Sequence, residues 1–143
     1  MRTWKKIEGH LGTPAGFRGA AVAAGIKKAK GALDLALISS DAAQTSAAGV
    51  FTTNLAAAEP VKLSREHLKA SGGYARAIII NSGNANACTG PRGRKAAIES
   101  ARAAARSLGI ATEQVLVAST GVIGVPLEFA RITSQLPALH ASL

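Results

Sequence analysis

The stretch Val115–Gly124, which reads VLVASTGVIG, constrains this 143-residue chain more than any other. Its apolar beginning, Val115 to Ala118, is typical of a buried strand, which we expect to stop at Ser119-Thr120-Gly121. A rigid strand that ends in a short polar turn holds that turn in a fixed place, where chemistry often occurs. A hydroxyl beside a glycine N–H supplies two donors suited to an anion or a developing oxyanion. The structural alternative is a tight turn whose threonine only bonds nearby backbone groups.

Four further segments have the composition of strands. Residues 16–28 of the glycine-rich N-terminal region contain a candidate edge strand, and the apolar segment Leu33–Ile38 lies between Gly and Ser-Asp. Ala48–Thr53 carries β-branched and aromatic residues, which favour strands. Ala75–Ile80 is the most strongly apolar of the four, so we expect it to be buried on both faces of a sheet.

Two helices are predicted between these strands. Ser64 is a good N-cap for a short helix over Arg65–Ala70, which Gly72-Gly73 would end. In Gly93–Leu108 the apolar residues recur at spacings of three and four, with most of the basic residues elsewhere. Gly109 follows as a C-terminal stop.

The last part of the chain predicts a third helix. Pro126 permits a helix over Leu127–Gln135, which Pro137 should interrupt, and Ala138–Leu143 would form a further apolar turn. The order of these elements predicts the α/β class, with a mixed α/β sandwich layer. A length of 143 residues suits one domain, and no internal repeat or linker divides it.

The composition is that of a globular protein with a weak core. Apolar residues make up 48% of the chain and charged residues 17%, so the chain is not of the disordered class. Aromatic residues make up only 3%, while alanine and glycine are plentiful. Small side chains pack closely but bury little area each. We therefore expect a partner or a further part of the protein to complete the core.

The formal net charge of +9 permits an acidic partner. The basic residues form small groups, Arg2/Lys5/Lys6, Lys27/Lys28/Lys30 and Arg92/Arg94/Lys95, rather than a dense run. Few aromatic residues lie among them for base stacking, so we do not expect nucleic acid as a partner. Two explanations of the positive net charge remain: the basic residues lie on solvated surfaces, or an acidic neighbouring segment compensates them.

Location follows from two absences in the sequence. The N-terminus lacks the apolar region of a secretory signal, and no apolar run approaches the roughly 20 residues that span a bilayer. A single cysteine, Cys88, excludes an intrachain disulfide framework. We expect a cytoplasmic protein without a membrane partner.

Several familiar site types find no support. No phosphate-loop, dinucleotide, HExxH or CxxC motif occurs, so neither a bound cofactor nor a metal is predicted. His10, His67 and His140 lack metal-ligand spacing and are interpreted as surface or helix-end residues. Cys88 has no histidine placed beside it and is interpreted as a buried or loop-lining small residue. Asp34 and Asp41 are not spaced as an evident acid/base pair.

The loop predicted at Asn81–Gly90, which reads NSGNANACTG, leaves two interpretations open. Asn and Gly tolerate left-handed backbone, and Asn or Ser side chains bond neighbouring backbone groups. Such a loop lines a polar pocket, or it is turn chemistry with a structural role only.

Taken together, several segments resemble one family, the ornithine acetyltransferases, also called glutamate N-acetyltransferases of arginine biosynthesis. The longest and most unusual are NSGNANACTG and VLVASTGVIGVPL. GFRGAAVAAGIK, DLALISSD, AAGVFTTN and REHL also match, in the family's order and at its approximate spacing. The resemblance covers essentially the whole chain and implies a mixed-sheet α/β sandwich of the ornithine acetyltransferase type.

The resemblance also implies an activity and a mechanism. Family members move an acetyl group from N-acetylornithine to glutamate, and some also use acetyl-CoA as a substrate. They are made as a precursor that cleaves itself before a threonine, which becomes the N-terminal nucleophile of a β chain paired with an α chain. Its own amine can serve as base for its hydroxyl. The STG segment matches the family's oxyanion hole, formed by the Thr120 hydroxyl and the Gly121 backbone N–H.

The chain departs from the family pattern at its end. The family's Lys-Gly stretch leading to Met-Ala-Thr, and the substrate-binding segment before it, have no match here. We therefore expect residues 1–143 to be one partial domain, incomplete at the C-terminus and equivalent to the N-terminal portion of an α chain. The expected partners are the rest of the α chain and the β chain, in a heterotetramer of two α and two β chains. As part of an acetyltransferase, the chain should be inactive by itself, because the nucleophilic threonine is missing from it. The alternatives to such an enzyme part are an inactive fragment and a repurposed basic binding module.

Overall fold

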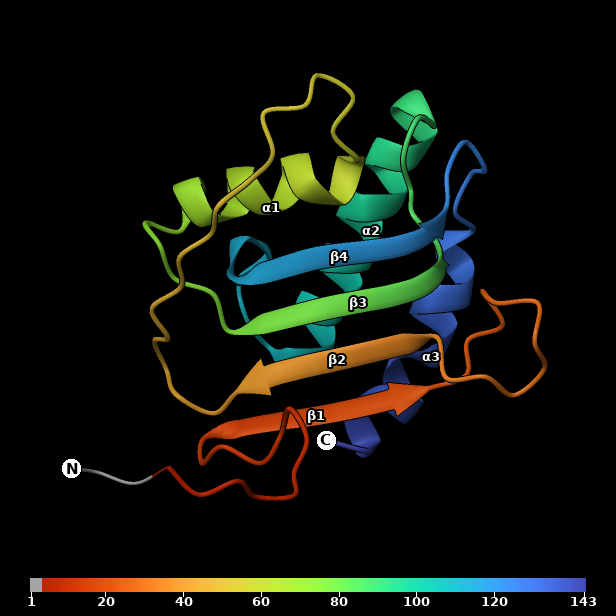
Figure 1. Ribbon diagram of the computed structural model, residues 1–143. Helices are drawn as coiled ribbons and strands as arrows, with labels where there is room; N and C mark the ends of the chain where they lie inside the picture. The colour runs from red at the N-terminus through yellow and green to blue at the C-terminus, as the bar shows by residue number, and fades with distance from the viewer. Residues whose placement is uncertain (1–3) are drawn as a thin grey trace.

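The computed structural model describes residues 4–143, which form one mixed sheet with helices beside it (Figure 1). The strands lie in the order β1-β2-β3-β4, with β1 against β2 and β2 against β3 antiparallel. The last pair, β3 and β4, is parallel, and the chain between them forms the longest helix. The four strands are β1 (Phe17–Val22), β2 (Leu35–Ser40), β3 (Ala77–Asn84) and β4 (Val115–Val122).

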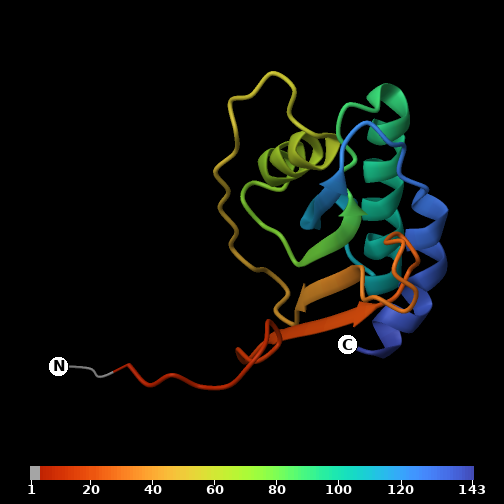
Figure 2. The same cartoon turned by 45° about the vertical axis from the view of Figure 1, so that its right-hand side comes forward.

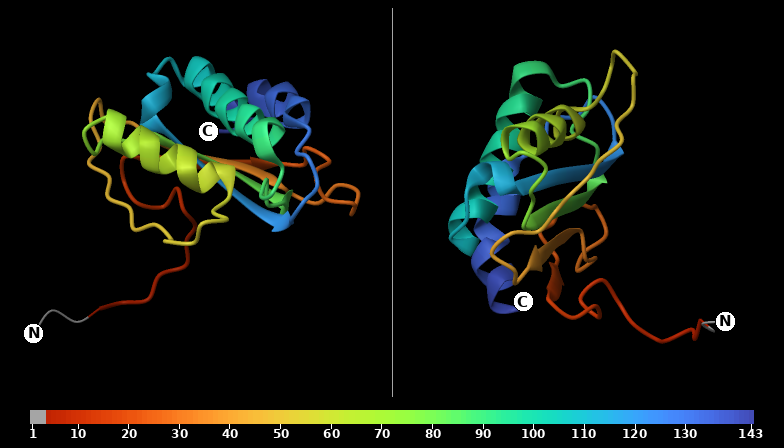
Figure 3. Two further views of the ribbon diagram at one scale, coloured as in Figure 1. Left: turned by 90° about the horizontal axis from the view of Figure 1, so that it is seen from above. Right: turned by 90° about the vertical axis from the view of Figure 1, so that its left-hand side faces the viewer.

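Two helices cover one face of this sheet and a third runs along its edge (Figures 2 and 3). The covering helices are α2 (Gly90–Leu108) and α3 (Phe129–Ala141). Helix α1 (Glu59–Ala70) lies beside β4, and a short 3₁₀ helix, η1 (Thr112–Gln114), leads into that strand. The helices are thus on one side of the sheet and at one edge, and the α/β class predicted from the sequence is confirmed.

The core lies between the sheet and the covering helices. Alternate residues of β2, β3 and β4 point into it, among them Leu35, Leu37, Ile79 and Val115, each at most 1% exposed. Helix α2 meets them with a stripe of alanines rather than with large side chains. Small side chains let the helix approach the sheet closely, at the cost of little buried area per residue. The alanine-rich composition is therefore explained by close packing of one helix on one sheet.

The opposite face of the sheet carries apolar side chains that no helix of residues 4–143 covers. Strand register places Ile38, Ile78 and Leu116 in one row across this face. The three side chains are only partly buried, and a cavity of about 330 Å³ lies over them, against the chain at Thr45–Ala48. We call this surface the open face.

Several predicted elements are corrected in extent. Ser64 is not an N-cap: α1 begins five residues earlier, at Glu59, with Pro60 in the first turn where its missing N–H costs nothing. The helix predicted to start at Gly93 begins at Gly90, and its stop at Gly109 is confirmed by a left-handed C-cap. The candidate edge strand in residues 16–28 is confirmed as β1.

Other predictions are wrong in kind. Ala48–Thr53 is not a strand but part of the irregular connection between β2 and α1. An isolated bridge between Ser46 and Tyr74 lies just before this segment. Pro137 does not interrupt the last helix, and α3 continues through it to Ala141. Burial of Ile132, Leu136 and Leu139 against the core outweighs the lost hydrogen bond.

Candidate functional site

Thr120 and Gly121 lie within β4, not in a turn after it. The strand predicted to stop at Ser119 continues to Val122, because β3 also extends beyond Ile80 to Asn84 and pairs with it. Register places Thr120 beside Ser82 and Gly121 beside Gly83. Both Thr120 and Gly121 are exposed.

Only glycine fits at position 121. Its φ of +133° is a backbone conformation that side chains rarely allow. A Cβ there would lie 2.3 Å from the carbonyl carbon of Gly83 and 2.5 Å from the backbone nitrogen of Asn84. The two facing glycines therefore let the ends of β3 and β4 approach more closely than any side chain would permit.

Strand alternation decides which way the Gly121 N–H points. In a parallel pair, alternate residues direct both backbone polar groups to the same side. The N–H and C=O of Val117 both point away from β3, since both bond the Ser64 side chain. By the same alternation we expect Gly121, four residues later on the same strand, to direct its N–H to this outer edge as well. Thr120, in register with Ser82, projects from the open face.

Helix α1 blocks the first half of that outer edge. The Ser64 hydroxyl donates to the Val117 carbonyl at 2.8 Å and accepts from the Val117 N–H at 2.9 Å. His67 Nδ1 lies 2.7 Å from the Val115 carbonyl. Both side chains are buried, so α1 takes the place of a fifth strand here. His67 was interpreted as a surface or helix-end residue; it does lie near the end of α1 but is buried.

A chain of buried asparagines fixes the second half of β4. The Ser119 hydroxyl donates to Asn81 Oδ1 at 2.5 Å, and Asn81 Nδ2 donates to the Asn84 carbonyl at 2.8 Å. Asn84 Oδ1 accepts the N–H of Asn86, and Asn84 Nδ2 donates to the carbonyl of Val125. The strand end before Thr120 and the chain after Val122 are thereby attached to the same loop.

Asn81–Asn84, predicted as the first part of a loop, are instead the last residues of β3, and α2 begins at Gly90. Both interpretations of this segment have support, because its asparagines bond neighbouring backbone groups and Asn84 also lines a cavity. Asn86 is fully buried with φ +47°, and it donates to the carbonyl of Gly93 in the first turn of α2. Cys88 is also left-handed, at φ +57°, and exposed on the loop. Sequence reasoning missed the pairing of this loop with Ser119. The signal in the sequence was the cluster of three asparagines, Asn81, Asn84 and Asn86, separated by small residues.

Asp34 is a second residue whose role the sequence did not indicate. Its carboxylate is buried and accepts the N–H groups of Ala24, Ile26 and Lys27 at 2.6, 2.6 and 2.8 Å. These bonds hold the connection after β1 against Gly83, where a Cβ would lie 3.1 Å from the Lys27 nitrogen. Asp41, by contrast, is exposed and forms an ion pair with Arg18.

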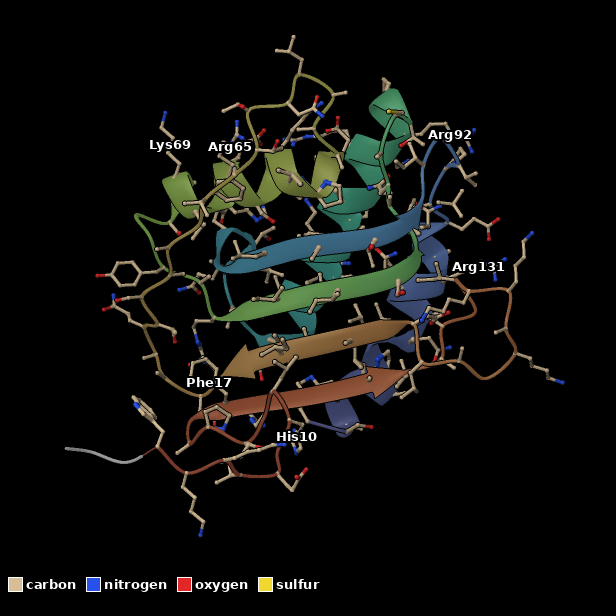
Figure 4. All side chains as sticks on the ribbon, viewed as in Figure 1. His10, Phe17, Arg65, Lys69, Arg92 and Arg131 are labelled. Carbon is tan, nitrogen blue, oxygen red and sulfur yellow. The ribbon has the colours of Figure 1, made fainter. Side chains whose placement is uncertain are left out.

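A basic cavity adjoins the ends of β3 and β4. It measures about 540 Å³, and Gly83 and Val122 line it next to Gly121. Its charged residues are Lys27, Lys28, Arg131 and Glu128, the last of which pairs with Arg131. Figure 4 shows Arg131 near the connection after β1, where its guanidinium donates to the carbonyl of Gly25.

The remaining titratable residues do not form a site within residues 4–143. His10 and His140 are exposed and far apart in the sequence, and no group of three or more His, Cys, Asp or Glu is placed to hold a metal ion. Of the basic groups in the sequence, Arg2 lies outside the described residues. In the same part of the chain, none of the helices has the length and apolar character needed to cross a bilayer.

Comparison with known proteins identifies the family of the chain. The ArgJ family model matches residues 18–143. An arginine biosynthesis bifunctional protein ArgJ from Gloeobacter violaceus is 50% identical over 139 residues, which are 97% of this chain and 34% of that protein. The ArgJ protein of Thermosynechococcus vestitus is 48% identical over 143 residues, 100% of this chain and 33% of that protein. The chain thus spans about a third of the length of the curated relatives it matches.

Solved structures agree. An ornithine acetyltransferase from Mycobacterium tuberculosis, solved in complex with ornithine, superposes with a TM-score of 0.85 at 42% identity, covering 92% of this chain and 69% of that one. The ArgJ protein of Bacillus halodurans gives a TM-score of 0.82 at 36% identity, covering 90% and 65%. By sequence and by fold, the chain belongs to the ArgJ family.

Proposed function

We propose that this chain is part of an enzyme that transfers an acetyl group from N-acetylornithine to glutamate, with acetyl-CoA as a possible second donor. Its relatives are named for arginine biosynthesis and for ornithine acetyltransfer, which supports this reaction class. The observation that carries the proposal is the Gly121 position. A glycine that nothing else can replace presents a backbone N–H at an exposed strand edge, directly after an exposed threonine hydroxyl.

In this proposal Thr120 and Gly121 form the oxyanion hole. As a nucleophile attacks the acetyl carbonyl, negative charge develops on its oxygen, and the two donors stabilise that charge. Such donors are effective because they are already in place before the reaction. The hydrogen bonds from Ser119 to Asn81 and from Ser64 to Val117 fix β4 just before Thr120, which restrains the position of both donors.

The nucleophile comes from elsewhere in the protein. None of the threonines here matches the family's nucleophilic threonine, and the chain corresponds to about a third of its relatives. We assign the nucleophile and most substrate contacts to the remaining two thirds, in a cytoplasmic assembly of two α and two β chains. The open face, with its row of Ile38, Ile78 and Leu116, is the surface on which that remaining part packs. The formal charge of +9 fits a less basic partner.

The experiment compares two proteins. The first is the 143-residue chain, and the second is the same chain followed by the sequence that follows the matched region in the Gloeobacter violaceus relative, here called the completed protein. We expect acetyl transfer from N-acetylornithine to glutamate by the completed protein and none by the chain alone. Transfer by the chain alone, or a folded completed protein without activity, would overturn the proposal.

A further inference from the structure

A small cavity lies at the end of the sheet opposite to Thr120 and Gly121. It measures about 40 Å³, enough for one water-sized guest, and is closed by Arg18, Ser39, Ser40, Arg76, Leu108 and Ile110. Ser39 and Arg18 are cross-strand partners in β2 and β1, and Arg76 directly precedes β3. The last two residues come from the end of α2 and the chain after it.

Two buried polar atoms facing this region have no partner within residues 4–143. They are the Ser39 hydroxyl and Arg76 Nε, and Ser39 is only 4% exposed. A buried donor without an acceptor costs free energy, which is why such atoms are rare in folded proteins. Both belong to the same cavity, so one guest would satisfy both.

The charge of Arg76 is also uncompensated by the described residues. Its guanidinium donates through Nη2 to the Ser40 carbonyl at 3.3 Å, a neutral acceptor, and it forms none of the ion pairs seen in this part of the chain. Arg18 differs because its Nε donates to the Asp41 carboxylate at 2.7 Å. One of the two guanidiniums is thus neutralised and the other is not.

The chemistry of the walls favours a guest that accepts hydrogen bonds and carries negative charge. Arginine has donors and no acceptor, and a serine hydroxyl can turn its hydrogen toward the guest. The Ser40 carbonyl is already occupied by Arg76, and the other walls are the apolar residues Leu108 and Ile110. A water molecule could bond the Ser39 hydroxyl and Arg76 Nε, but it would leave the charge of Arg76 uncompensated. A monatomic anion accepts from every direction and adds the missing negative charge.

We propose that this cavity binds a single chloride-sized anion, held by Arg76 Nε and the Ser39 hydroxyl. The site is independent of acetyl transfer. It joins the ends of β1, β2 and β3 to the end of α2, where an alanine-rich core offers little buried area. We expect sulfate and phosphate, which are larger, to bind more weakly than chloride.

The test follows the NMR signal of the Arg76 Nε–H group in the 143-residue chain during a chloride titration. Sulfate replaces chloride at constant ionic strength, so general screening stays the same. The structure predicts a saturable shift with chloride and with bromide. In Ser39→Ala we expect roughly tenfold weaker binding, because one donor to the anion is lost. This variant should fold, since the hydroxyl has no partner among the described residues.

Ser134→Ala is the matched control, because Ser134 is exposed on α3 and bonds only its own helix; its affinity for chloride should equal that of the unchanged chain. Crystals grown in sodium bromide give an independent readout, an anomalous peak beside Arg76 Nε and Ser39 Oγ. A shift that does not saturate, equal affinity in Ser39→Ala, or a water in place of the bromide peak would each overturn the proposal.

Discussion

The two halves of β4 present the same outer edge to very different surroundings. In the first half, the Ser64 side chain bonds both backbone groups of Val117, and His67 bonds the carbonyl of Val115. In the second half, the edge beside Thr120 and Gly121 is exposed. One helix thus closes the part of the edge that supports the core and leaves the last part accessible.

This contrast separates buried polar groups that hold the strand from polar groups on the same strand that stay accessible. An exposed strand edge invites unwanted pairing, and proteins usually cover it. Here the covered half carries buried valines, whereas the accessible half carries a hydroxyl, a glycine and no large side chain before Val122. Gly121 lies at this exposed edge, in a position that only glycine can occupy. This combination supports the proposal that the Gly121 N–H belongs to an oxyanion hole.

The largest effect on folding is expected for Gly121→Ala. Its Cβ would lie 2.3 Å from Gly83, and the left-handed backbone adds strain, so the strand ends must separate. We expect a loss of about 3 kcal/mol or more in the free energy of unfolding, measured with urea. Gly31→Ala is the control, because Gly31 also has a positive φ, of +75°, but no neighbour within 4 Å of the added Cβ. Its loss should be about 1–2 kcal/mol, and equal losses would contradict the crowding of β3 on β4.

Ser64→Ala tests the closed half of the edge. It leaves the N–H and C=O of Val117 without their partner in a buried place, so we expect a loss of about 1–3 kcal/mol in unfolding free energy. Hydrogen exchange at the Val117 amide should accelerate. Ser134→Ala, on an exposed helix surface, should change stability by less than about 0.5 kcal/mol. If both variants behave alike, α1 does not hold β4 through Ser64.

Ser119→Ala tests the link between β4 and the asparagine loop. One hydrogen bond, of 2.5 Å to Asn81 Oδ1, is lost, with an expected cost of about 1 kcal/mol. A double-mutant cycle with Asn81→Ala should give a coupling energy of about 0.5–1.5 kcal/mol. Additive losses in the double variant would mean that the two side chains do not act on each other.

The strands and helices with clear patterns were predictable from sequence. Apolar runs indicated β2, β3 and β4, and the alanine spacing together with Gly109 indicated α2. The predicted ends of strands were wrong where pairing with a distant strand determines how far the strand continues. Pairing with β3 carries β4 through Ser119-Thr120-Gly121, which local chemistry alone interprets as a turn.

Residues whose role depends on distant partners could not be predicted. Ser64 has the chemistry of an N-cap, yet its partner is Val117, 53 positions away. Asp34 looked like an isolated acid, and only the fold brings three N–H groups to it. Ala48–Thr53 has the composition of a strand, but within residues 4–143 it pairs with no other strand. By contrast, Thr120 and Gly121 are proposed as site residues because resemblance to a family carries information that local patterns lack.

The smallest effect on folding belongs to the residue of greatest interest. Thr120 is exposed and lies beside Ser82 on the open face, so Thr120→Ala should change the free energy of unfolding by less than about 0.5 kcal/mol. A larger loss, measured by urea unfolding, would assign Thr120 a structural role instead.

The most direct test of the account is the acetyl-transfer rate of Thr120→Ala in the completed protein. Removing one oxyanion donor should lower kcat by roughly 10²- to 10³-fold. Thr120→Ser, which keeps the hydroxyl, should retain most of the rate. A kcat that is unchanged in a folded Thr120→Ala protein would contradict the assignment of the accessible end of β4 as the oxyanion hole.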